Sequence, residues 1–74
     1  MSPEESVTFL IDVIKSTSTT YTPSIRTAAI DGLGYVGGDE VRAFLVGLIK
    51  STNTRYTPAM RAAAAVALGR ASQG

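Results

Sequence analysis

The 74-residue sequence contains no cysteine and no histidine. Disulfide bonds and the Cys/His zinc sites that stabilise many small folds are therefore excluded, as is catalysis by a thiol or an imidazole. We expect no metal and no cofactor. The acidic N-terminus, with Glu4 and Glu5, lacks the basic start of a secretory signal, and the early apolar stretch is far shorter than a bilayer span. We therefore expect a cytoplasmic protein.

An internal repeat dominates the sequence. A shift of 35 positions aligns residues 4–36 with residues 39–71, and 16 of the 33 aligned pairs are identical. A period between about 20 and 50 residues is typical of proteins built from stacked units, in which each unit buries its apolar face against its neighbours. We expect a single domain over residues 1–74, with one repeat unit at 3–37 and the other at 38–72.

Each unit is predicted to form two helices, at about 3–15 and 23–34 in the first unit and at 39–50 and 58–71 in the second. Ser2 and Glu5 form the pattern of a capping box, and Thr22 and Thr57 each precede a proline, which is a common helix start. The apolar residues of the first helices recur at helical spacing. They are Val7, Leu10, Ile11 and Ile14, and in the second unit Val41, Phe44, Leu45, Leu48 and Ile49.

The second helix of each unit is predicted to bury a face rich in alanine. The expected inward residues are Ile25, Ala28, Ala29 and Leu33, and in the second unit Met60, Ala63, Ala64 and Leu68. Gly34 and Gly69 are expected to end these helices in a left-handed conformation. The predicted fold is all-α, with four antiparallel helices in two stacked hairpins.

The second helices resemble the B helix of a HEAT-like repeat. The resemblance rests on a proline, an arginine, two small residues and a Leu-Gly pair in the same register: Pro23, Arg26, Ala28, Ala29, Leu33 and Gly34, then Pro58, Arg61, Ala63, Ala64, Leu68 and Gly69. The second copy is similar to phycobilisome lyase-type HEAT repeats. The resemblance implies an α-α superhelix, or solenoid, that binds other proteins; a minority of such proteins are similar to bilin lyase subunits or DNA-base glycosylases.

One position departs from the family pattern. Many HEAT-like repeats have an aspartate six residues before the B-helix arginine, where it pairs with arginines along the stack. Thr20 and Arg55 occupy these positions here. We therefore expect Arg26 and Arg61 to have other partners.

The charges are divided unevenly along the chain. Residues 1–40 hold six acidic and two basic residues, a net charge of −4, whereas residues 41–74 hold five basic residues and no acid. This dipolar pattern favours contact between the acidic end of one molecule and the basic end of another, or binding of an acidic partner or nucleic acid. The alternative is that the acids at the helix N-termini only stabilise those helices.

The candidate partner-binding residues lie in the second unit and its connection. Ala59, Ala62, Ala65 and Val66 form an apolar outer face where the first unit has Ser24, Thr27, Ile30 and Asp31. Because a helix that is apolar all round is normally buried, we expect a further repeat or a second copy to cover this face. The alternative is that alanine, a strong helix former, simply tolerates exposure.

Two tyrosines and one arginine in the polar connections are further candidates. Tyr21 and Tyr56 either form a contact surface or fold back over Arg26 and Arg61 as staples with cation–π character. Arg55 is expected to contact a partner, because no helix cap requires it.

No combination of nucleophile, base and paired carboxylates indicates catalysis. The sequence therefore favours a non-catalytic module for binding another protein or for assembly, either as a homo-oligomer such as a homodimer or within a longer array. The alternatives are an accessory subunit of a bilin lyase or related modification enzyme, and a nucleic-acid-binding fragment that uses the basic half of the chain.

Overall fold

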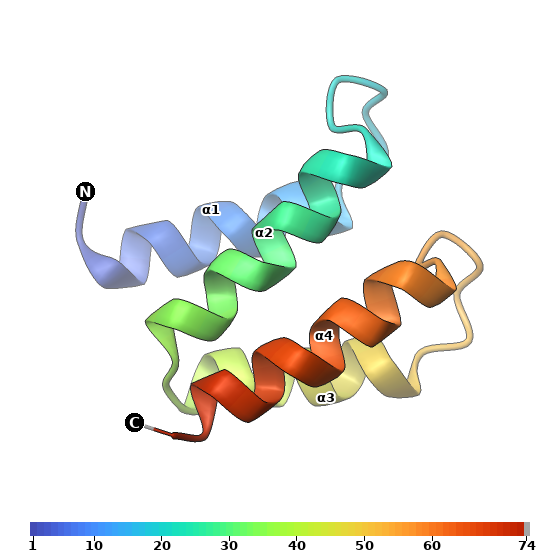
Figure 1. The fold of residues 1–74 in the computed structure, drawn as a ribbon. Coiled ribbons are helices and arrows are strands. Elements are labelled where there is room, and N and C mark those ends of the chain that lie inside the picture. Colours follow the sequence, from blue (N-terminus) through green and yellow to red (C-terminus); the bar gives the residue numbers. More distant parts are fainter. Residues whose placement is uncertain (74) are drawn as a thin grey trace.

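The computed structural model describes residues 1–73, which leaves out only Gly74, and these residues form four helices and no strand. The helices are α1 (Pro3–Lys15), α2 (Pro23–Val36), α3 (Asp39–Lys50) and α4 (Pro58–Ala71). In Figure 1, α2 and α4 lie side by side in front, with α1 behind α2 and α3 behind α4. The two units contact each other mainly through α2 and α4. None of these four helices is long and apolar enough to cross a membrane.

The starts of α1, α2 and α4 follow from local capping, whereas α3 begins after Gly38 without a side-chain cap. The hydroxyl of Ser2 accepts the backbone N–H of Glu5 at 3.2 Å, and the Glu5 carboxylate accepts the backbone N–H of Ser2 at 2.9 Å. Thr22 and Thr57 cap α2 and α4 through their hydroxyls. The observed bounds of α1, α3 and α4 agree with those expected from the sequence, whereas α2 continues two residues further, to Val36.

The prediction that Gly34 and Gly69 end their helices was wrong. Both lie inside helices, and α2 ends at Gly37, whose positive φ of 72° suits a residue without a side chain. Gly34 has a different role, because a Cβ atom there would lie 2.9 Å from the Cα atom of Ala67. This glycine therefore lets α2 and α4 approach each other closely.

The predicted inward face of α2 also needs correction. Ile25 and Ala28 are exposed, and Ile30, expected on the outer face opposite the predicted inward residues, is completely buried. The reason is that α2 packs against both α1 and α4, so it buries a wider arc than a helix with one partner. The largest fully buried side chains are Ile14, Ile30, Leu33, Leu45, Met60 and Val41.

Candidate functional site

The internal repeat makes it possible to compare burial at positions 35 residues apart. In some pairs one residue is covered by the neighbouring unit, whereas the equivalent residue of the other unit has no neighbour and is exposed. Such pairs mark the outer surfaces at the two ends of the molecule. Four positions of α4 are exposed where their counterparts in α2 are buried or half-buried, and we call them the C-terminal face: Ala62, Ala65, Val66 and Gly69. In unit one, four apolar residues are exposed where their counterparts in unit two are buried or half-buried, and we call them the N-terminal face: Phe9, Ile25, Ala28 and Val36.

The C-terminal face is the outer side of α4. Val66 is 55% exposed, and none of the four residues has a polar side chain. The counterparts of Ala65 and Gly69 in α2 are Ile30 and Gly34, which α4 covers. Unit two thus presents, uncovered, the same side that unit one uses to bind its neighbour.

Of the four α4 residues predicted to bind a partner, three belong to this face. Ala62, Ala65 and Val66 are exposed together, one turn apart. Ala59 is exposed as well, but so is its counterpart Ser24, which no neighbour covers. The comparison between units therefore places Ala59 outside the C-terminal face.

The N-terminal face is formed by α1 and α2. Phe9 is 51% exposed and Ile25 is 44% exposed, whereas their counterparts Phe44 and Met60 are half-buried and fully buried. Five of the seven large hydrophobic residues that are exposed in residues 1–73 are Phe9, Ile25, Val36, Val46 and Val66. The first three lie on the N-terminal face and Val66 on the C-terminal face. Val46 on α3 is more exposed than its counterpart Ile11, which matches the pattern of the C-terminal face.

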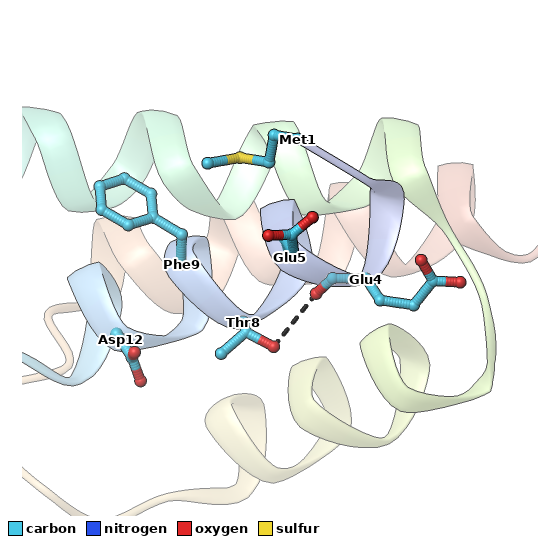
Figure 2. A pocket seen from close by; sticks show the side chains of 6 residues that line it. All are labelled: Met1, Glu4, Glu5, Thr8, Phe9 and Asp12. Carbon is cyan, nitrogen blue, oxygen red and sulfur yellow. Dashed lines mark hydrogen bonds between the residues drawn. The ribbon is translucent and has the colours of Figure 1, made fainter.

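A shallow hollow of about 420 Å³ surrounds Phe9 on the outer side of α1. Figure 2 shows its lining residues, with the Thr8 hydroxyl donating to the backbone carbonyl of Glu4 at 3.1 Å. Glu4, Glu5 and Asp12 give the rim three carboxylates. In residues 1–73 these acids do not gather into a group that could hold a metal ion. The hollow thus combines an exposed aromatic ring with negative charge.

The corresponding ring in unit two is already covered. Lys15 of unit one places its ammonium group 5.9 Å from the centre of the Phe44 ring, within the range of a cation–π contact. Lys15 and Phe44 line a second hollow at the junction of the units. Phe9 occupies the same position in unit one, but no lysine lies over its ring in residues 1–73.

Arg55 binds within the chain. Its guanidinium donates to the backbone carbonyls of Lys15 and Ser16, both at 2.7 Å, and so satisfies the C-terminal end of α1. The local sequence around Arg55 does not indicate these bonds, because the partners lie 40 and 39 residues away in the chain. Arg55 is a clamp between the two units.

Two tyrosines and two arginines that recur in both units hold the connections in place. Tyr21 and Tyr56 are half-buried against the core. The cation–π contacts within residues 1–73 are those of Lys15 with Phe44 and Arg70 with Tyr35, so the expected stacking on Arg26 and Arg61 is absent. Arg26 and Arg61 instead donate to backbone carbonyls of the preceding connections, those of Ser18 and Asn53.

Three comparisons give this chain no relatives: no protein-family model matches it, and neither a curated protein nor a solved structure was found that is similar to it.

Most of the basic groups in the second half of the chain have partners within the molecule. Arg42 donates to the carbonyl of Ala71 at 3.0 Å and pairs with Asp39, and Arg70 lies over Tyr35. Together with the clamp of Arg55 and the contact of Arg61, these interactions spread the positive charge over several sites.

Proposed function

We propose that the chain is a non-catalytic protein-interaction and assembly module made of two HEAT-like units, a short segment of an α-α solenoid. The observation that carries this proposal is the C-terminal face, where Ala62, Ala65 and Val66 are exposed, whereas the same side of unit one is buried at Ile30 and half-buried at the other two positions. Repeat arrays need end units with polar outer faces to stay soluble and separate. The C-terminal face has no polar side chain of this kind.

The size of the chain supports the same proposal. Repeat proteins usually need three or more units, because each unit buries its core only against its neighbours. With two units of 35 residues, the large hydrophobic residues Phe9, Ile25, Val36, Val46 and Val66 are left exposed. Association with another protein, or with another copy, completes the burial that a third unit provides in a longer array.

The test is the mass of the protein in solution at micromolar concentration, measured by light scattering. We expect the wild type to associate and Val66→Asp to reduce that association at least tenfold, because it puts a charge in the middle of the apolar face. Ala59→Asp is the matched control, since it adds the same charge to the same helix outside the face. A wild type that stays monomeric, or equal effects of the two substitutions, contradicts the proposal.

A further inference from the structure

We propose that the C-terminal face of one copy of this chain binds the N-terminal face of a second copy, head to tail, by repeating the packing that joins the two units within a chain. This inference rests on the proposed function and names the partner. Within one molecule, the side of unit one that contains Ile30 and Gly34 contacts the side of unit two that contains Met60 and Ala67. The same two sides are exposed at opposite ends of the molecule.

The glycines of the two helices support this pairing. Gly34 is needed because the backbone of α4 lies within 3.0 Å of where its Cβ would be, at the Cα and carbonyl oxygen of Ala67. Gly69 occupies the equivalent position in α4, but a Cβ there would meet nothing within 4 Å. Glycine inside a helix costs about 1 kcal/mol relative to alanine, and nothing within this molecule explains it at Gly69. A second copy would bring Gly32, the counterpart of Ala67, against it.

The ends are also complementary in charge. Lys15 covers Phe44 within the chain, and the equivalent pair across two copies is Lys50 with Phe9. Phe9 has Asp12 beside it in the hollow of Figure 2, where Phe44 has Gly47. The incoming ammonium group of Lys50 thus meets both an aromatic ring and a carboxylate. The net charges of −4 and +5 on the two parts of the chain attract in the same orientation.

One element of the intramolecular contact is missing between copies. Arg55 clamps the end of α1, but its counterpart in unit one is Thr20, which cannot reach the carbonyls at the end of α3 in the same way. The two connections have the same local hydrogen bonds, from the backbone N–H of Tyr21 to Ser18 and of Tyr56 to Asn53. Contact between copies is therefore weaker than contact between units, and it is reversible.

Because the two binding faces differ, this contact is heterologous, and repeating it gives an open chain of molecules or a ring. A mixing experiment tests it directly. Ile25→Asp blocks the N-terminal face and Val66→Asp blocks the C-terminal face; both positions are exposed, so each variant keeps a folded core. We expect each variant alone to be monomeric by sedimentation velocity, and an equimolar mixture to form dimers that grow no further.

The outcomes separate this inference from the proposed function. If Val66→Asp is monomeric while Ile25→Asp associates as the wild type does, the interface is symmetric or involves a different face, and the head-to-tail inference is wrong although the proposed function stands. If the wild type is monomeric, both are wrong.

A gain of affinity provides an independent test. Thr20→Arg restores the missing clamp, and we expect the dissociation constant between copies to fall roughly tenfold, since two charge-assisted hydrogen bonds are added at a partly exposed site. Thr19→Arg is the control, because it adds the same charge to the neighbouring residue, whose counterpart Thr54 makes no hydrogen bond across the units in residues 1–73. Equal dissociation constants for the two variants contradict the proposed register.

Discussion

At the scale of single residues, two glycines with the same place in the repeat have different surroundings. The backbone of α4 lies against Gly34, whereas Gly69 is open. We expect Gly34→Ala to lower the free energy of unfolding by about 1–2 kcal/mol, because the cost of overpacking exceeds the gain in helix propensity. Gly69→Ala is expected to raise it by up to about 1 kcal/mol. Urea unfolding at low protein concentration measures both, and changes of the same sign contradict the close approach of α2 and α4.

The Ser2–Glu5 capping box is the residue-scale source of a pH dependence. The hydrogen bonds that Ser2 makes to Glu5, through its backbone N–H first and its hydroxyl second, hold the pKa of this carboxyl below its ordinary value of 4.5. A lowered folded-state pKa contributes stability that is complete above the ordinary pKa and is lost as the pH falls through the folded-state pKa. The stability of α1 therefore decreases on acidification below about pH 4.5.

Replacing the titrating group tests this dependence. We expect Glu5→Gln to make the free energy of unfolding less sensitive to pH between about 5 and 3 than in the wild type, because glutamine accepts the same bond without titrating. Glu4→Gln is the control in the same helical turn. Thermal unfolding followed by circular dichroism across this pH range measures the effect; identical pH profiles for wild type and Glu5→Gln would disprove it.

At the scale of helices and connections, Arg55 joins the two units. Its guanidinium bonds to the carbonyls of Lys15 and Ser16, and it is half-buried. We expect Arg55→Ala to lower the free energy of unfolding by about 1–2 kcal/mol, which is reduced from the full value of two charged hydrogen bonds because water still reaches the site. Arg70→Ala, which removes an exposed arginine over Tyr35, is expected to cost about 0.5 kcal/mol or less. Equal losses in urea unfolding contradict the clamp.

The helices were predictable from the sequence because their signals are local. Ser2, Thr22 and Thr57 each act within three residues, and the apolar spacing of α1 and α3 depends only on helical geometry. The burial of Ile30 and the clamp of Arg55 depend on a second unit dozens of residues away. The residue pattern of a single helix contains neither signal, so it places Ile30 on the outer face and leaves Arg55 free for an external contact.

At the scale of the whole molecule, the sequence predicts one of the two candidate faces, the C-terminal face, but not the N-terminal face. The loss of polar residues from Ser24 to Ala59 and from Asp31 to Val66 pointed to the outer side of α4. The N-terminal face was not found from the sequence, because Ile25 and Ala28 match positions of α4 that are buried or half-buried, yet both are exposed in α2. The internal repeat does indicate this face. Each side that is buried between the two units has an equivalent side that is exposed at one end of the molecule.

The charge separation along the molecule predicts how association responds to salt. The N-terminal face lies beside Glu4, Glu5 and Asp12, and the C-terminal face belongs to the part of the chain with a net charge of +5. We expect association to weaken several-fold between about 20 mM and about 300 mM salt, because exposed charges are screened beyond a distance of about 10 Å at 0.1 M. Light scattering at fixed protein concentration measures the change, and association that is independent of salt contradicts the electrostatic part of the contact.

The central claim is that the packing between the two units is used again between molecules. Sedimentation equilibrium of the wild-type chain from about 5 to about 500 μM tests it most directly, because a heterologous contact that does not close into a ring adds molecules without limit. The account predicts a weight-average mass that rises continuously with concentration, past twice the chain mass of 7.7 kDa. A mass that stays at 7.7 kDa, or that reaches a plateau at the dimer, would contradict it.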